Sequence, residues 1–429
     1  MSLPSISSGL LHIHPDERRP VALSLAYFFC LLASYYLLRP VRDEMGIRAG
    51  VEQLQWLFSA TFLVMLAAVP AFGWASSRWP RERLVPAVYL FFIAGLLGFY
   101  LLLQTDSPWW NTWAARAFYV WVSVYNLFVV SVFWSLMADL FSQRQGKRLF
   151  GIIAAGGSVG AIFGPGIAAL LAQTAGTTQL LPAAALLLFG ALLCARLLTR
   201  AKAAPDRSGR PQVHAALGGG IWEGVSEVIQ QRRLQAIALF IWLYTTLATF
   251  LYFEQAHIVA ATFSDSADRT TTFALIDLAV NGLTVGLQLF VSGRLMQGMG
   301  LGRSLALVPA LLALGFAALA FAPVLAVLAG VQIVRRAGNY GITRPAREVL
   351  YTGVERSARY KAKNFIDTVV YRGGDALAGW LFTGLKSLGL SASGIALLAV
   401  PLALGWAALG LWLGNNCEED NDERQDDRP

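Results

Sequence analysis

Ionisable side chains interrupt several long apolar stretches of this chain, and their chemistry has to be explained first. Arg335 and Arg336 lie twelve and thirteen residues after Pro323, which is about 18–20 Å along a helix. Arg372 lies eight residues after Asn364, or about 12 Å along a helix. A charged side chain inside hydrocarbon costs about 2.5–3.5 kcal/mol even on insertion scales, so each one needs a reason. Guanidinium groups bind phosphate or carboxylate bidentately, and the three arginines therefore predict a site for an anion.

Carboxylates lie close to these arginines in the sequence. Asp367 and Asp375 fall on one helical face at a spacing of eight residues, and Arg372 lies one step round the helix. Two interpretations stay open at this level. Arg372 forms a structural ion pair with one of the two aspartates, or these charges face a bound solute. The same choice applies to Arg39 and Glu254, which could pair with each other.

Other kinds of site chemistry find no support in the sequence. Three cysteines lie far apart without a CxxC pair, and four histidines include no HExxH pattern. The sequence therefore predicts no disulfide scaffold, no thiolate metal centre and no zinc site. We find no convergent His/Asp/Ser set for a membrane-embedded transferase. We expect no enzyme activity, no metal and no cofactor.

The composition indicates an integral membrane protein. Of the 429 residues, 56% are hydrophobic and 14% charged, whereas soluble domains carry about a quarter charged residues. The 25 Phe and 13 Trp also exclude a disordered chain. A membrane-spanning helix needs about 20 apolar residues. Twelve stretches meet this need: 20–39, 54–75, 84–103, 111–138, 149–173, 179–198, 234–262, 270–293, 304–321, 323–343, 364–385 and 391–414.

The distribution of basic residues predicts the orientation. With the N-terminus inside, the cytoplasmic segments hold 25 of the 34 lysines and arginines, and the outer loops hold five. Such a bias follows the positive-inside rule. The net charge of +8 is thereby explained by topology, and no nucleic-acid partner is needed. The five basic residues that we assign to outer loops are Arg39, Arg42, Arg48, Arg269 and Lys386.

These observations predict five regions and an all-α fold of twelve transmembrane helices in two six-helix bundles. Residues 1–19 form a cytoplasmic stub, 20–198 the first bundle and 199–233 a polar cytoplasmic linker. Residues 234–414 form the second bundle. The acidic segment 415–429 is predicted to be a disordered tail.

The two halves repeat each other weakly but in the same order. Leu32–Tyr36 is echoed at an offset of 215 residues by Leu247–Leu251. At the same offset, Arg148 and Gly164 correspond to Lys363 and Gly379, and the loops after the second and eighth spans share Gly and Arg positions. Parallel six-helix repeats joined by a cytoplasmic linker are the plan of alternating-access transporters.

Two loops and one glycine-rich span resemble signatures of the major facilitator superfamily. The loop after the second span has Gly73-x4-Arg78-x-x-Arg81, and the loop after the eighth has a related Gly-Arg-Leu pattern. The run Gly160-Ala-Ile-Phe-Gly164-Pro165 resembles the antiporter motif of that superfamily. Gly156, Gly160 and Gly164 repeat every four residues, which favours close helix contact. A phosphate-binding glycine loop is not indicated, because no strand precedes the run.

Three further stretches resemble the bacterial and plastid ATP/ADP translocases. They are Tyr36-Leu-Leu-Arg39-Pro-Val-Arg42-Asp43, then Phe133-Trp134 with Lys147-Arg148-Leu149-Phe150, and Asn339–Tyr351 followed by Tyr360–Asp367. Three positions differ from that family's pattern. Asn339 precedes Tyr340 where a lysine is usual, Arg42 replaces a lysine, and the acidic residue expected near Val122 or Ser123 is absent.

We therefore predict a secondary transporter that moves an anionic, nucleotide-like solute across the membrane by alternating access, through a central site between the two halves, with exchange as one mode. The residues predicted to bind the solute are Arg335, Arg336, Arg372, Arg42, Asn339, Tyr340, Arg39 and Tyr36. The residues predicted to serve coupling or gating are Asp277, Glu254, Asp367, Asp375, Glu348 and Arg347.

Two alternatives remain beside this hypothesis. One is a proton-coupled permease or exporter in which Asp277 or Glu254 carries the proton. The other is a non-transporting receptor or assembly factor with the same fold. We expect a monomer in the bacterial inner membrane, with both termini cytoplasmic and with lipid and a small anionic solute as its partners.

Overall fold

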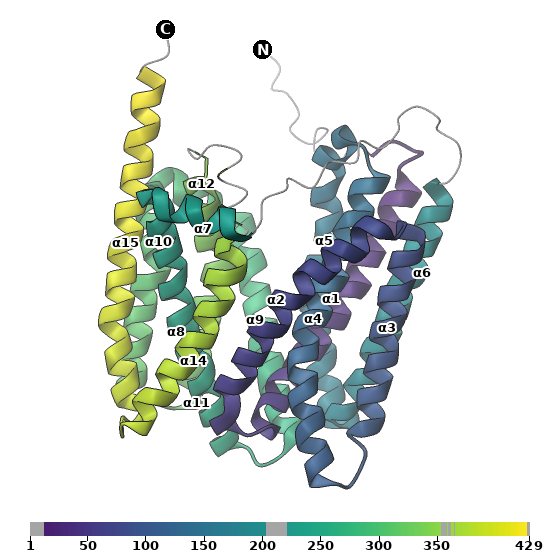
Figure 1. The fold of residues 1–429 in the computed structure, drawn as a ribbon, viewed down its shortest axis with the longest axis horizontal. Helices are drawn as coiled ribbons and strands as arrows, with labels where there is room; N and C mark the ends of the chain where they lie inside the picture. The colour runs from purple at the N-terminus through teal and green to yellow at the C-terminus, as the bar shows by residue number, and fades with distance from the viewer. Residues whose placement is uncertain (1–12, 203–220, 353–357, 359–361, 364, 427–429) are drawn as a thin grey trace.

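The computed structural model describes residues 13–202, 221–352, 358, 362–363 and 365–426, and this part of the chain is helical without strands (Figure 1). Helices are the expected solution, because hydrocarbon offers no water to satisfy backbone N–H and C=O groups. Within these residues, ten helices are long and apolar enough to cross a membrane. They are α1 Arg18–Arg48, α2 Leu54–Arg78, α3 Arg81–Leu102, α4 Pro108–Leu140, α5 Gln143–Ala175, α6 Leu180–Lys202, α8 Arg232–Thr262, α9 Ser266–Phe290, α10 Ser292–Phe321 and α15 Ala392–Asp426.

The two remaining predicted spans are interrupted by π-helical turns. The first consists of α11 (Leu325–Gly338), a π-helix at Asn339–Thr343 and α12 (Arg344–Leu350). The second consists of a π-helix at Ile366–Val370 and α14 (Tyr371–Ser387). Each regular piece is too short to count as a span alone, although the turns join them into continuous helices. The predicted all-α membrane fold of twelve spans is confirmed in this form.

The spans form two bundles that stand side by side in Figure 1, α1–α6 in one and α8–α15 in the other. The start of α1, the end of α15 and the short helix α7 (Ile221–Gln230) lie at the same end of the molecule. We call this end the linker face and the other end the opposite face. Large apolar side chains such as Leu63, Leu101 and Leu186 are 63–71% exposed on the outside of the bundles, as expected of a surface covered by lipid.

Helix α1 extends nine residues beyond the predicted span, which corrects the placement of its charges. Pro40 lies inside the helix and does not end it. Arg39 and Arg42, which the sequence analysis assigns to an outer loop, are therefore helical residues of the first span. Asp43 and Glu44 are 7% and 0% exposed. The run of charges resembles a polar loop because four ionisable residues follow each other closely, but each finds a partner inside the protein.

Two other boundaries differ from the sequence prediction. Helix α15 continues to Asp426, so the segment after residue 414 is helical through Asp426 rather than disordered. Most of the predicted linker, residues 203–220, lies outside the described residues, and its last part forms helix α7. Helices α7 and α8 are separated by Gln231 alone.

The two bundles are tied together at the opposite face. Glu44 of α1 accepts hydrogen bonds from Nε and Nη2 of Arg269 on α9, at 2.6 and 2.8 Å. Glu52, in the 3-10 turn Val51–Gln53, accepts one from Nζ of Lys386 on α14 at 2.9 Å. The Glu44–Arg269 pair is bidentate and its carboxylate is buried, whereas Lys386 makes one hydrogen bond to an exposed glutamate, so the Glu44 pair has the more specific geometry. These ties close the opposite face between the bundles.

Glycines set the distance between α1 and α5. A methyl group on Gly160 would lie 2.5 Å from the carbonyl oxygen of Phe29, and one on Gly164 would lie 2.7 Å from that of Ala33. Both separations are far below van der Waals contact, so the helices can pack this closely only over glycine. The close contact predicted from the four-residue spacing is confirmed.

We predict that Gly160→Ala lowers the stability of the protein by about 1–3 kcal/mol, because the backbone of α1 must move away. Gly166 on the same helix is the matched control, since a methyl group there meets no atom within 4 Å. Gly166→Ala should be neutral or stabilise the helix by up to about 1 kcal/mol. Thermal unfolding in detergent measures both, and equal melting temperatures for the two variants would contradict the packing argument.

Candidate functional site

A polar cavity lies between the two bundles and has two connected compartments. The larger has a volume of about 630 Å³ and the smaller about 150 Å³. On α1, the larger compartment is lined from Phe28 to Arg42 and the smaller from Arg39 to Asp43, so the larger lies nearer the linker face. The residues shared by both are Arg39, Arg42, Tyr244, Tyr340, Tyr371, Arg372 and Asp375.

The cavity is accessible from the linker face and closed toward the opposite face. Arg344, which lines the larger compartment, is exposed, and the side chain of Asp367 is 36% exposed. The ties made by Glu44 and Glu52 lie beyond the small compartment, at the other end of α1. In this arrangement the cavity is reached from the linker face.

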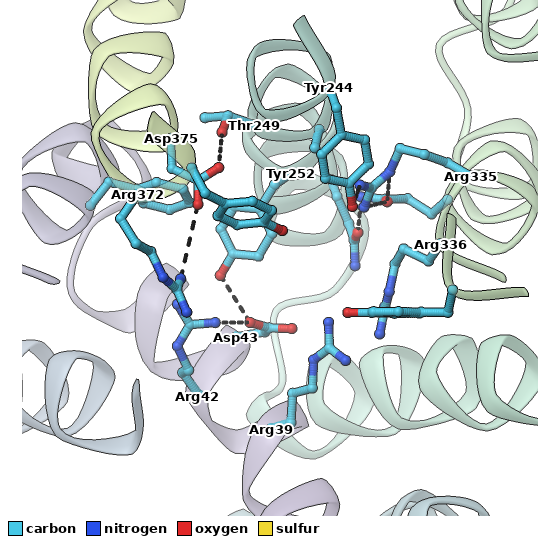
Figure 2. A pocket seen from close by; sticks show the side chains of 16 residues that line it. Arg39, Arg42, Asp43, Tyr244, Thr249, Tyr252, Arg335, Arg336, Arg372 and Asp375 are labelled. Atoms are coloured by element: carbon cyan, nitrogen blue, oxygen red, sulfur yellow. Dashed lines mark hydrogen bonds and ion pairs between the residues drawn. The ribbon is translucent and has the colours of Figure 1, made fainter. Parts of the chain in front are cut away.

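Positive charge dominates the lining. Of the described residues, seven arginines and three aspartates line the two compartments. The arginines are Arg39, Arg42, Arg335, Arg336, Arg344, Arg347 and Arg372, and the aspartates are Asp43, Asp367 and Asp375. Even when the buried Asp277 behind the wall is included, guanidinium groups exceed carboxylates. Figure 2 shows that side chains from helices of both halves point toward the same pocket.

One arginine of the lining is neutralised by a tight ion pair. Nη2 of Arg336 on α11 lies 2.5 Å from Oδ1 of Asp277 on α9, and both residues are buried. Nε of Arg39 on α1 lies 3.6 Å from the other oxygen of Asp277, which has no hydrogen bond of its own. This carboxylate thus holds α11 against α9 and attracts the other bundle through Arg39.

The remaining ion pairs in the cavity are looser. Arg42 lies 3.5 Å from Asp43, and Arg372 lies 3.9 Å from Asp375. Both aspartates are also held by hydroxyl groups: Tyr252 donates to Asp43 at 2.9 Å and Thr249 to Asp375 at 3.3 Å (Figure 2). Distances beyond 3.2 Å are longer than those of charge-assisted hydrogen bonds, so these guanidinium groups can exchange their partner for a solute anion at little cost.

Arg347 shows the same pattern nearer the linker face. Its Nη2 lies 3.3 Å from Asp367, while its buried Nε has no hydrogen-bond partner. The two residues come from α12 and from the second π-helix. The first π-helix contributes Asn339 and Tyr340 to the lining, so both π-helical turns supply residues to the cavity wall, in keeping with the frequent occurrence of such turns at functional sites.

Arg335 differs from all of these because its partners are neutral. Its Nε and Nη2 donate to Oε1 of Gln332 at 3.2 and 2.8 Å, and its Nη1 donates to the hydroxyl of Tyr244 at 3.3 Å. Arg335 is 7% exposed, and no ion pair of the described residues includes it. Its guanidinium group lines the small compartment without a carboxylate of the described residues at ion-pair distance.

Aromatic and amide side chains complete the larger compartment. Asn126 and Asn339 can donate and accept hydrogen bonds, and Ser123 adds a hydroxyl group. Tyrosine rings surround them, contributed by Tyr35, Tyr36, Tyr244, Tyr340 and Tyr371. Val122 also lines this compartment, and neither Val122 nor Ser123 carries a charge.

The structure brings together most of the residues that the sequence singled out. All eight predicted solute-binding residues line the cavity: Arg335, Arg336, Arg372, Arg42, Asn339, Tyr340, Arg39 and Tyr36. Of the predicted coupling residues, Asp367, Asp375 and Arg347 line it, and Asp277 lies directly behind it. Their roles stay predictions.

Two predicted coupling residues lie outside the lining. Glu348 points away and pairs with Lys363 at 2.5 Å. Glu254 is not part of either compartment, and the suggested pair between Arg39 and Glu254 is wrong, because Arg39 lies against Asp277 instead. Helix α8 turns Glu254 from the cavity while placing Gln255, one residue on, in its wall.

Several lining residues escaped the sequence analysis. Gln332 lies one helical turn before Arg335, and Tyr244 lies in the middle of an apolar span without a charged neighbour. Asp43 was hidden by the assumption of a loop, and Arg344 was visible only within the translocase-like block. Helical spacing from Arg335 could have found Gln332. The sequence carries no comparable signal for Tyr244.

The described residues hold no cluster of three or more His, Cys, Asp or Glu side chains that could bind a metal ion. The site is therefore described by its arginines, amides and tyrosines.

We predict that the same substitution affects the stability of the protein differently at the two neighbouring arginines. Arg336→Gln leaves the buried Asp277 without its close partner and should destabilise the protein by about 3–5 kcal/mol. Adding Asp277→Asn should restore much of that loss. Arg335→Gln should change the melting temperature little, because it removes no ion pair. A double-mutant cycle on melting temperature tests this, and equal destabilisation by Arg335→Gln would contradict the assignment.

Comparisons with known proteins agree with this architecture. The family model described as Major Facilitator Superfamily matches two segments of the chain, residues 10–147 and 128–347. A comparison with curated proteins finds no match.

Several solved structures share the fold. The nucleoside transporter NupG aligns with a TM-score of 0.60 and 13% identity, over 95% of this chain and 99% of that one. The POT family transporter PepTSo aligns with a TM-score of 0.65 and 12% identity, over 94% and 98%. A bacterial homologue of the human lysosomal transporter Spinster, in an inward-facing and unoccupied conformation, gives 0.58 and 13%, over 95% and 99%. The twelve helical spans, the cavity between two bundles and the match over most of the sequence lead to one conclusion: this chain belongs to the major facilitator superfamily and is a multi-pass membrane transporter.

Proposed function

We propose that this transporter carries a small anionic solute, with a nucleotide-like solute as the favoured class. The observation that carries the proposal is the charge of the cavity, in which seven arginines face fewer carboxylates and Arg335 has neutral partners. Uncompensated guanidinium groups inside a membrane are costly, and a bound anion would remove that cost.

The shape of the cavity favours an anion with an organic part. The small compartment gathers Arg39, Arg42, Arg335 and Arg372, and fits a compact charged group. The larger compartment offers tyrosine rings and the amides of Asn126 and Asn339, and fits a polar ring or sugar. The resemblance to ATP/ADP translocases and the structural similarity to a nucleoside transporter support a nucleotide-like solute.

Alternating access is the mechanism that this arrangement supports. In the described arrangement the cavity opens to the linker face, and the pair Glu44–Arg269 closes the opposite face. Reorientation would break this pair and close the bundles over the linker face. Closing an empty cavity would bury arginine charge without compensation, whereas a bound anion would compensate it. Because the empty transporter would reorient more slowly than the loaded one, this cost favours the exchange of one anion for another.

The proton-coupled alternative is less well supported by the positions of its two carboxylates. Asp277 lies between Arg336 and Arg39, so a proton on it would break the buried pair that holds α11 against α9. Glu254 does not line the cavity. A receptor without transport would keep the binding site, and uptake into proteoliposomes distinguishes it from a transporter.

We predict that Arg335→Gln weakens the binding of ADP and inorganic pyrophosphate about ten- to a hundredfold, the value of a lost charge-assisted hydrogen bond. Arg335→Lys should recover part of the affinity, because the charge returns without the planar fork. Arg78→Gln is the control, since Arg78 is exposed and stacks on Trp74 outside the cavity. Isothermal titration measures these affinities. Equal binding of neutral adenosine and ADP by the unchanged protein would contradict an anion site.

We also propose that the linker face is cytoplasmic and that the protein acts as a monomer in a bacterial inner membrane. The excess of lysine and arginine on the linker-face segments supports this orientation.

We predict that a membrane-impermeant maleimide labels Asp106→Cys in intact cells, because the loop between α3 and α4 lies at the opposite face. Ser226→Cys on the exposed side of α7 should be labelled only after the membrane is permeabilised. Both variants are made in a background without the three native cysteines. Labelling of Ser226→Cys in intact cells would reverse the proposed orientation.

A further inference from the structure

The guanidinium group of Arg335 is held in place by a chain of buried amides. Gln332 accepts two of its N–H groups through Oε1, and the hydroxyl of Tyr244 accepts a third. Gln332 is 1% exposed, so these hydrogen bonds do not compete with water. Two of the five guanidinium N–H groups remain, one on each terminal nitrogen, and can bind a ligand.

The orientation of Gln332 is itself determined by its neighbours. Its Nε2 donates to Oε1 of Gln255 at 2.5 Å and to the backbone oxygen of Leu251 at 3.3 Å. A guanidinium group can only donate and the Leu251 carbonyl can only accept, so the amide oxygen must face Arg335 and the amide nitrogen must face α8. Gln255, 3% exposed, completes the connection from α11 to α8.

The neutrality of this partner distinguishes Arg335 among the buried arginines of the lining, since Arg344 is exposed. Arg42, Arg336, Arg347 and Arg372 each have an aspartate within 3.9 Å. A glutamate at position 332 has nearly the shape of glutamine and could accept the same two hydrogen bonds, but it would cancel the charge. The amide keeps the guanidinium oriented and leaves its charge for the solute.

We propose that Gln332 is a positioning residue for anion binding, which orients Arg335 toward the small compartment without neutralising it. The inference rests on the proposed function, since it assumes that Arg335 contacts an anionic group of the solute. It assigns a role in specificity to an uncharged residue. The affinity of the site for an anion then depends in part on an amide, and not a carboxylate, lying behind Arg335.

Two substitutions separate charge from orientation. Gln332→Glu keeps the acceptor for Arg335 and adds a negative charge. Gln332→Met has a similar size and leaves the charge of Arg335 unchanged, but it removes the acceptor. We expect Gln332→Glu to weaken the binding of inorganic pyrophosphate at least about tenfold, as does Arg335→Gln. Gln332→Met should bind with an affinity between those of Arg335→Gln and the unchanged protein.

A purely structural role predicts the reverse order. If Gln332 served only to hold α11 against α8, Met would be the harmful substitution and Glu, which can pair with Arg335, the mild one. The melting temperature is measured alongside: both variants lose the donor to Gln255 and Leu251, so we expect similar melting temperatures although Gln332→Glu binds less. Gln230→Glu, on the exposed side of α7, is the matched control for an added charge and should bind as the unchanged protein does.

The dependence of affinity on salt gives a second readout. The dissociation constant for pyrophosphate should rise less steeply with salt in Gln332→Glu, because one attractive charge has been cancelled, and as steeply as normal in Gln332→Met. If Gln332→Glu does not fold, the salt dependence of Gln332→Met is compared with that of Arg335→Gln, and this comparison tests the role of Gln332. Equal affinity and equal salt dependence of those two variants would overturn the proposal.

The outcomes distinguish this inference from the proposed function. If the unchanged protein and all variants fail to bind pyrophosphate, phosphate and ADP, the anion site and the role of Gln332 both fall. If the unchanged protein binds and Arg335→Gln does not, while Gln332→Glu binds normally, the anion site stands and the role of Gln332 is refuted.

Discussion

The carboxylate of Asp277 is the interaction on which the centre of this protein depends. It lies 2.5 Å from Arg336 of its own bundle and 3.6 Å from Arg39 of the other bundle. A lone charge at this depth would be costly, and removing one partner of a buried pair costs more than the pair itself contributes. The pairing therefore lowers the cost of placing Arg336 inside the membrane. The adjacent Arg335 makes no ion pair with a carboxylate of the described residues. The positive cavity is a consequence of this division.

The same physical constraint explains how the two bundles meet. At the opposite face, buried Glu44 accepts two hydrogen bonds from Arg269, the bidentate geometry in which charge-assisted hydrogen bonds are short and specific. Within the cavity the pairs are longer, between 3.3 and 3.9 Å, apart from the pair of Arg336 with Asp277. Tight pairs thus lie where the bundles or helices are held, and loose pairs lie where a solute would enter. This difference in pairing, together with a cavity open at one face, is the observation behind our proposal of alternating access.

The glycine and π-helical features position the site rather than form it. Glycines on α5 bring that helix onto the backbone of α1, which carries Arg39, Arg42 and Asp43. The π-helical turns at Asn339–Thr343 and Ile366–Val370 lie in consecutive spans of the second half. The helices at the corresponding places of the first half, α4 and α5, are regular over 33 residues each. The repeat between the halves is therefore broken where the cavity is lined.

The sequence by itself determined the membrane class, the number of spans, the division into two halves and most of the residues around the cavity. The apolar stretches predict the spans, and the positions of Arg335, Arg336 and Arg372 within those stretches predict a polar cavity. Both inferences are possible because the cost of burying backbone and charged groups in hydrocarbon can be estimated for each segment separately. The sequence did not determine which charges pair. Arg39 meets Asp277 and not Glu254, and α1 continues past Pro40, because partners on other helices satisfy the charges that follow it. The role of Gln332 and Tyr244 was likewise decided by tertiary structure, since a neutral acceptor acquires its meaning only from the arginine that the fold places beside it.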